Sequence, residues 1–168
     1  MTRWSVRLNG SDRDRGPLQA PAASDAQEFV ITESLGYLLN RAARSMAHQL
    51  AQELRPAGIG IGQWAVLLFL WARDGLSQAE LSRVVAIEPP TMVRTIDRMV
   101  RDGLATRASD PDDARLTRIY LTERGRSLRD ELIPKAIAVN TATLGRLTPA
   151  EGRTLQRLLG KLVSQPDR

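Results

Sequence analysis

Residues 76–104 read LSQAELSRVVAIEPPTMVRTIDRMVRDGL, a pattern typical of two short helices joined by a tight turn. Ser77 and Glu80 have the spacing of a capping box, in which each side chain bonds a free backbone amide at the start of a helix. We expect this helix to end near Val85. Pro89-Pro90 suits the first turn of the next helix, where a missing amide hydrogen costs nothing. The stretch therefore predicts a helix-turn-helix.

The second of these helices has two chemically different sides. At about 100° per residue, apolar side chains fall in one arc and polar side chains in the opposite arc. The apolar arc holds Met92, Val93, Ile96, Met99 and Val100, and the polar arc holds Thr91, Arg94, Thr95, Arg98 and Arg101. Arginine and threonine side chains bind phosphate groups and base edges. The polar arc is thus predicted to read DNA, and the alternative is an ordinary solvated helix face.

A hairpin is predicted directly after this helix. Residues 104–109 and 116–122 have the character of extended chain, and the sequence Asp110-Pro111-Asp112-Asp113 between them is a strong turn signal. A helix-turn-helix followed by a hairpin indicates a winged helix-turn-helix. The turn carboxylates could instead hold a hard cation, but a tight turn is a poor setting for one, so no metal site is predicted.

Long helices are predicted on both sides of this lobe. Leucine and alanine recur at spacings of three and four from Glu33 to Leu54, the period of one helical face. Downstream, a helix begins near Thr122 and is expected to kink at Pro134, and a second capping box at Thr148 opens a final helix. The first helix would be ~33 Å long, too long for the lobe to cover its apolar stripe. A second copy of the chain would cover it, so we expect a two-fold dimer. The alternative is that the leucines in and just before the last helix, Leu147, Leu155, Leu158 and Leu162, belong to the core of the single chain.

Composition disfavours most enzyme chemistry. The chain has no cysteine and a single histidine, His48, so it cannot form a disulfide, a thiolate site or a histidine-rich metal site. We expect no catalytic residue and no cofactor. The net charge is +5, and of the 24 basic residues only Lys135 and Lys161 are lysines. Arginine suits nucleic acids, although genomic arginine bias would give the same composition.

No run of the chain approaches the ~18 uninterrupted apolar residues of a membrane helix. Residues 1–10 also lack the apolar core of a signal peptide. We therefore expect a cytoplasmic protein that has no membrane partner.

Several motifs in one order resemble those of a known family. They are LGYLL (35–39), QWAVL (63–67), LSQAEL (76–81), TMVRTIDRM (91–99), GL (103–104) and DARLTRIYLT (113–122). The last contains the wing signature D-x-R-x-x-x-I-x-L. Over about residues 34–163 the chain thus resembles the MarR family of transcriptional regulators. The resemblance implies a mainly α fold with a small β-hairpin wing, a winged helix-turn-helix with N- and C-terminal dimerisation helices.

The resemblance divides the chain into regions. Residues 1–24 are predicted to be a flexible basic arm, within which the role of Trp4 stays open, and residues 25–168 a single MarR-like domain. Within that domain, residues 59–122 would form the DNA-binding lobe. The flanking segments 25–58 and 123–168 would supply the dimerisation helices.

The family also implies a function, that of a homodimeric repressor on a pseudo-palindromic operator in double-stranded DNA. Arg115 at the wing tip would enter the minor groove, and Asp113 would brace it, the alternative for Asp113 being a residue that only forms the turn. Ala114 stands where the family commonly has a second arginine, and Pro89-Pro90 replaces more polar residues, which weakens the expected phosphate contacts. The residues expected to face the major groove are Pro90, Thr91, Arg94, Thr95 and Arg98.

The resemblance further implies release from DNA by a small organic, often aromatic, effector. The candidate ligand-binding residues are the polar and aromatic side chains Tyr37, Arg44, His48, Trp64 and Trp71. Each could instead be an ordinary structural residue, above all the two tryptophans, which suit a core. The alternative function is a winged-helix module that binds another protein and no operator.

Overall fold

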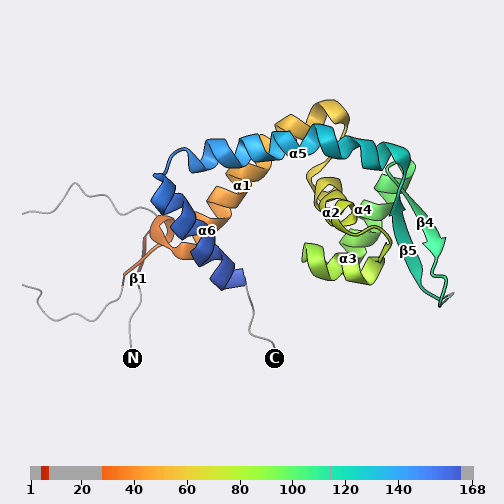
Figure 1. Cartoon of the computed structure of the whole chain (residues 1–168). Coiled ribbons are helices and arrows are strands. Elements are labelled where there is room, and N and C mark those ends of the chain that lie inside the picture. Colours follow the sequence, from red (N-terminus) through yellow and green to blue (C-terminus); the bar gives the residue numbers. More distant parts are fainter. Residues whose placement is uncertain (1–4, 8–27, 114, 164–168) are drawn as a thin grey trace, which may run out of the picture. The chain divides into compact units, whose positions relative to one another are not determined.

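The computed structural model describes residues 5–7, 28–113 and 115–163 and is mostly helical, with small sheets (Figure 1). The chain divides into two compact units, residues 1–46 and 47–168. The predicted fold class, mainly α with a β-hairpin wing, is confirmed.

The first unit holds a short parallel strand pair and the start of a long helix. Strand β1 (Ser5–Arg7) pairs with β2 (Glu28–Val30), and a 3-10 turn (Ile31–Glu33) leads into α1 (Leu35–Leu54). Neither strand of this pair was predicted from the sequence. Trp4 and the rest of the predicted basic arm lie outside the described residues.

The second unit contains the winged helix-turn-helix, and its elements follow the predicted order. The sheet is antiparallel, with strand order β3-β5-β4, and the two-residue strand β3 was not predicted. After a 3-10 turn (Arg55–Ala57), the elements are α2 (Ile61–Ala72), β3 (Leu76–Ser77), α3 (Gln78–Val85), α4 (Pro89–Arg101), β4 (Ala105–Ser109), β5 (Thr117–Leu121), α5 (Glu123–Leu144) and α6 (Pro149–Val163).

Local hydrogen bonds explain where the helices begin. The Glu80 amide donates to Ser77 Oγ (3.2 Å), and the Ser77 amide donates to Glu80 Oε2 (2.8 Å), which confirms the predicted capping box. The second predicted box is confirmed at α6, where the Thr148 amide donates to Glu151 Oε2 (2.8 Å) and the Glu151 amide to Thr148 Oγ1 (3.4 Å). Helix α5 continues through Pro134 as one helix.

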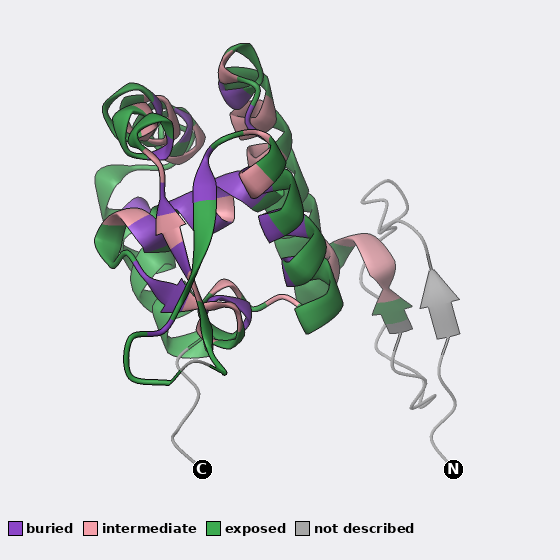
Figure 2. Ribbon diagram, turned by 90° about the vertical axis from the view of Figure 1, so that its right-hand side faces the viewer, coloured by how far each residue is buried: buried purple, intermediate pink, exposed green. Residues whose placement is uncertain are grey.

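The core of the lobe is built around α2, whose residues Val66, Leu67 and Leu70 are fully or almost fully buried. Buried side chains of α3, α4 and β5 pack against it, and Figure 2 shows the buried segments gathered where these helices and the sheet meet. At the turn between α3 and α4, Ala86 has φ 57°, a left-handed conformation that costs an alanine roughly 1 kcal/mol. The packing of the core and the conformation of this turn together fix the position of α4 in the lobe.

The C-terminal helices keep a large apolar surface uncovered in the single chain. On α6, the exposed fractions of Leu158 and Leu162 are 46% and 62%, and Ile137 on α5 is 58% exposed. Among the helices that the structure describes, none is by itself long and apolar enough to cross a membrane, although α1 and α2 together, bent at the break between them, reach the needed length and composition.

Candidate nucleic-acid interface

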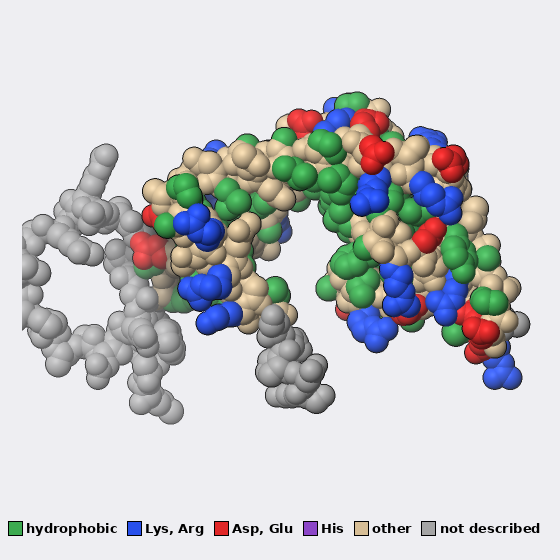
Figure 3. Space-filling view, viewed as in Figure 1, with side chains coloured by type: hydrophobic (Ala, Val, Ile, Leu, Met, Phe, Trp, Pro, Cys, Tyr) green, Lys and Arg blue, Asp and Glu red, His purple; other side chains and the backbone are tan. Residues whose placement is uncertain are grey.

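Helix α4 presents a bare polar side to the surface of the lobe. It packs on α2, α3 and β4, and Met92, Ile96 and Met99 are completely buried there. The opposite side, with Thr91, Arg94, Arg98 and Arg101, is exposed, as is Pro90 in the first turn. Figure 3 shows Lys and Arg side chains along the outer edge of the lobe that carries α3, α4 and the hairpin.

Thr95 corrects the prediction for this helix. Its side chain is 1% exposed, and its Oγ1 donates a hydrogen bond to the Thr91 carbonyl (2.9 Å), so it cannot reach a base. A Cβ on Gly62 of α2 would lie at an ordinary van der Waals distance from Thr95 Oγ1 (3.6 Å), so Thr95 packs directly against α2. The buried stripe is residues 92, 95, 96 and 99, rotated slightly from the predicted arc. Val93, expected to be packed, is 37% exposed.

Two arginines of α4 keep their donor groups free. Among the described residues, neither Arg94 nor Arg98 has an ion-pair or hydrogen-bond partner for its side chain, whereas Arg101 pairs with Asp102 (3.1 Å). The acid of this helix, Asp97, is neutralised by Arg107 of β4 (2.6 Å). The free guanidinium groups can therefore bind phosphate or base edges, and the nearest acid does not compete for them.

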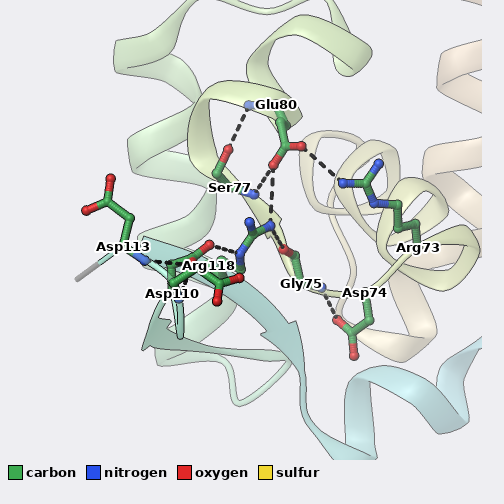
Figure 4. Close-up of polar contacts among 9 residues, drawn as sticks. Arg73, Asp74, Gly75, Ser77, Glu80, Asp110, Asp113 and Arg118 are labelled. Atoms are coloured by element: carbon green, nitrogen blue, oxygen red, sulfur yellow. Dashed lines mark hydrogen bonds and ion pairs between the residues drawn. The ribbon is translucent and has the colours of Figure 1, made fainter. Parts of the chain in front are cut away.

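The turn of the wing is organised by one buried carboxylate, Asp110, whose side chain is 2% exposed. Its Oδ1 accepts hydrogen bonds from the amides of Asp112 (2.8 Å) and Asp113 (3.1 Å), and its Oδ2 accepts one from Arg118 Nε (Figure 4). The Asp112 amide, supported by Arg118 and the Asp113 amide, holds the pKa of Asp110 below its usual value although burial opposes this. The carboxylate is therefore charged at neutral pH.

Asp113 and Arg115 lie at the wing tip. The Arg115 amide donates to Asp113 Oδ1 (3.0 Å), so Asp113 contacts the backbone of Arg115. The Arg115 side chain is exposed and has no partner among the described residues. Ala114, the predicted departure from the family pattern, lies outside the described residues. The entry of Arg115 into a minor groove stays a prediction.

Sequence reasoning missed the polar residues that join the wing to the rest of the lobe. Arg118 Nη1 donates to the Gly75 carbonyl (2.9 Å), and Asp74 Oδ1 accepts hydrogen bonds from the amides of Gly75 (3.1 Å) and Leu121 (2.9 Å). Asp74 Oδ2 also accepts a hydrogen bond from Arg126 (3.2 Å). Apart from the neighbours Asp74 and Gly75, the partners in these bonds lie more than forty residues apart in the chain. No local spacing could have revealed them.

The predicted effector residues do not form one site in either unit. Trp64 is buried and Trp71 is half-buried, their rings meet edge to face with centroids 5.6 Å apart, and Trp71 Nε1 donates to the Gly125 carbonyl (2.8 Å). Both tryptophans are thus core residues. Nε2 of the His48 ring lies 3.1 Å from Nε2 of the Gln52 side chain.

The other two candidates lie in the first unit. Tyr37 Oη accepts a hydrogen bond from Arg41 (3.3 Å), and Arg44 is exposed. A groove of about 550 Å³ lies between α1 and α5 in the second unit, and none of the predicted effector residues lines it. Its lining is Gln49, Gln52, Glu53, Pro134, Lys135, Ala138, Val139 and Ala142. In the part of the chain that the structure describes, no group of three or more His, Cys, Asp or Glu side chains is placed to hold a metal ion.

Comparison with known proteins agrees with this geometry. A family model described as MarR family matches residues 57–116. The HTH-type transcriptional repressor Rv2887 of Mycobacterium tuberculosis is 31% identical over 130 residues, which cover 77% of this chain and 94% of the relative. The solved complex of Rv2887 with salicylic acid has a TM-score of 0.62 at 30% identity and covers 77% of this chain and 96% of that chain.

Two further solved structures are similar. BpsR of Bordetella bronchiseptica, whose DNA binding is regulated by 6-hydroxynicotinic acid, has a TM-score of 0.76 at 28% identity and covers 82% of this chain and 99% of that chain. A mutant MarR of E. coli complexed with operator DNA has a TM-score of 0.73 at 25% identity and covers 77% of this chain and 93% of that chain.

Proposed function

This chain belongs to the MarR family of transcription regulators, and from that premise we propose that it is a homodimeric repressor that binds a pseudo-palindromic operator and is released by a small aromatic acid. Proteins of the family regulate transcription and are not enzymes. The observation that carries the proposal is the uncovered polar side of α4, where Arg94 and Arg98 have no partner among the described residues.

The proposed contacts divide between the two grooves of DNA. Arg94 and Arg98 enter the major groove, where a guanidinium can bond guanine O6 and N7 together. Pro90 and Thr91 lie at the start of the same helix and approach the backbone and the base edges. Arg115 reaches the minor groove, whose negative potential is strongest where A·T runs narrow it. Asp113 holds the backbone of Arg115 at the tip of the wing.

The dimer follows from the uncovered leucines. The apolar side of α6 carries exposed Leu155, Leu158 and Leu162, and Leu35 and Leu38 of α1 are also exposed. Packing against a second copy removes this surface from water and relates two recognition helices by a two-fold axis. Such a pair matches half-sites about 34 Å apart on one side of a duplex.

The effector is proposed from the relatives, one solved with salicylic acid and one regulated by 6-hydroxynicotinic acid. Both are small planar aromatic acids. Tyr37, Arg44 and His48 stay the candidate contacts, because they combine an aromatic or cationic side chain with exposure or partial exposure. Trp64 and Trp71 pack in the core of the lobe and are not proposed as ligand contacts.

Selection from random duplexes tests the proposal. The full chain should enrich an inverted repeat, and the recovered duplex then serves as the probe for release by salicylate or 6-hydroxynicotinate. An enriched repeat that neither acid releases would refute the effector class alone. No enriched sequence, together with salt-tolerant capture of a protein, would refute operator binding and favour the protein-binding module.

The arginines of α4 should dominate base preference. Arg94→Ala and Arg98→Ala are each expected to cost on the order of 1 to 3 kcal/mol of operator binding and to relax the preferred base at one position of each half-site. Arg115→Ala should mainly weaken selection of A·T-rich flanks. Fluorescence anisotropy with the selected duplex and its single-base variants measures both effects. Arg129→Ala, an exposed arginine of α5, is the matched control, and unchanged affinity in all three test variants contradicts the assignment.

A further inference from the structure

One arginine of the wing contacts three separate segments of the lobe (Figure 4). Arg118 lies on β5; its Nε donates to Asp110 in the wing turn, and its Nη1 donates to the Gly75 carbonyl (2.9 Å) and lies 3.8 Å from Glu80 Oε2 on α3. We propose that Arg118 is a positioning residue, which holds the wing, and with it Arg115, in a set position relative to α4. This inference rests on the proposed function.

The hairpin needs such a tie because its backbone connection to the lobe is short. Strand β3 pairs with β5 over only two residues, Leu76 with Ile119 and Ser77 with Arg118. Beyond that point the hairpin is a two-stranded ribbon, and such ribbons twist and are marginal in water without further support. Arg118 of β5 pairs with Ser77, the last residue of β3, and from this position its side chain can support the part of the ribbon that β3 does not reach.

At one end of the tie, Asp110 controls the shape of the turn. The Asp110 carboxylate accepts hydrogen bonds from the amides of Asp112 and Asp113, and the Asp110 amide donates to the Leu116 carbonyl (2.9 Å). A buried carboxylate is costly unless a cation and hydrogen bonds compensate it. The guanidinium of Arg118 supplies the charge, so the turn that carries Asp113 and Arg115 depends on it.

At the other end, the tie reaches the start of α3. Glu80 Oε2 caps α3 through the Ser77 amide, and Glu80 Oε1 pairs with Arg73 at the end of α2 (3.2 Å). Because α3 packs directly on α4, a wing held against Glu80 and Gly75 is held relative to the recognition helix. Arg118 thus joins the two proposed reading elements.

Arg118 is badly placed to bind DNA itself. Its side chain is 28% exposed, and both its Nε and its Nη1 already donate to oxygen atoms of the lobe. Arg115 is exposed and has no partner among the described residues. Any effect of Arg118 on operator affinity should therefore pass through the wing tip.

A double-mutant cycle tests this dependence. The affinities of wild type, Arg118→Met, Arg115→Ala and the double variant are measured for the duplex recovered by selection, at one salt concentration. We expect Arg118→Met to weaken binding about fivefold in the wild-type background and less than about twofold in the Arg115→Ala background, because residues joined through one hydrogen-bond network couple, and here the network runs through Asp110 and Asp113. Arg129→Met removes the same charge from an exposed site of α5 and should change neither value.

The outcomes separate the inference from the function on which it rests. Equal losses in both backgrounds, or no loss in the wild-type background, overturn the positioning role of Arg118 while operator binding stands. A wild-type chain that binds no duplex overturns the proposed function and the inference with it.

A second measurement needs no DNA. In Arg118→Met, the amides of Asp112 and Asp113 should exchange with solvent at least about tenfold faster, because the carboxylate that accepts them loses its cation. Arg118→Lys, which keeps the charge but loses the planar fork, should give an intermediate rate. If Arg118→Met does not fold, the exchange rates are compared between Arg118→Lys and wild type instead. Exchange that stays at the wild-type rate in the folded variant overturns the proposal.

Discussion

Gly125→Ala is expected to destabilise the lobe by about 3 kcal/mol, the largest effect that we expect from adding a methyl group at any described glycine. Gly125 lies in the first turn of α5, and a Cβ on it would clash with the Leu104 carbonyl oxygen and lie 3.1 Å from Leu121 Cδ2. The Leu104 carbonyl cannot move away freely, because it accepts a hydrogen bond from the Thr122 amide (3.0 Å) and Leu104 is fully buried.

The clash would spread beyond the glycine itself. The Gly125 amide donates to Thr122 Oγ1 (3.0 Å) as the cap of α5, and the Gly125 carbonyl accepts Trp71 Nε1 (2.8 Å). A shift of the first turn of α5 therefore strains the cap and the contact with α2 together. We expect the loss to appear as a lower midpoint of urea denaturation, with little change in slope.

A glycine in open space provides the control. A Cβ on Gly160 of α6 would have nothing within 4 Å in the chain, so Gly160→Ala should leave stability unchanged or raise it by up to ~1 kcal/mol through helix propensity. Equal stability of the Gly125→Ala and Gly160→Ala proteins would show that the contact between Gly125 and Leu104 is not close in solution.

Leu158→Glu is expected to convert the dimer into a monomer and to weaken operator binding on the order of a hundredfold or more. Leu158 is 46% exposed in the single chain and lies on the apolar side of α6 with Leu155 and Leu162. A second copy would bury this position, and burying an unpaired carboxylate costs several kcal/mol. A monomer presents one recognition helix instead of two.

The measurement is the molar mass by sedimentation or light scattering, together with operator affinity. Arg157→Glu introduces the same side chain at the neighbouring, exposed position of α6, about 100° away from Leu158 and off the leucine stripe. It should keep the dimer mass. A Leu158→Glu protein with unchanged mass would place the dimer contact elsewhere, and a wild-type monomer would remove the dimer from the proposal.

Most of the fold could be predicted because the signals are local. Both capping boxes, the two prolines at the start of α4 and the turn after Ser109 each act within a few residues, and the structure has all of them where the spacing placed them. The short strands β1, β2 and β3 were missed, since two or three residues are too few to show a period.

The candidate site was predicted in outline and corrected in detail. Arg94 and Arg98 are far from the border between the two arcs of α4, so the period alone assigned them to the exposed side. Thr95 lies on that border, where a small rotation decides burial, and in the structure it packs against Gly62 of α2. The aromatic pair Trp64 and Trp71 was compatible with a ligand site or a core, and their mutual contact assigned them to the core.

The amino-acid sequence by itself determined which segments are helices, where they begin, and which side of α4 carries the free guanidinium groups, because capping and periodicity act over a few neighbouring residues. Only the tertiary structure decided that Thr95 is buried and that Arg118 joins Asp110, Gly75 and Glu80. Those contacts depend on the packing of α2 against α4 and on the pairing of β3 with β5, which bring together residues that no local pattern relates.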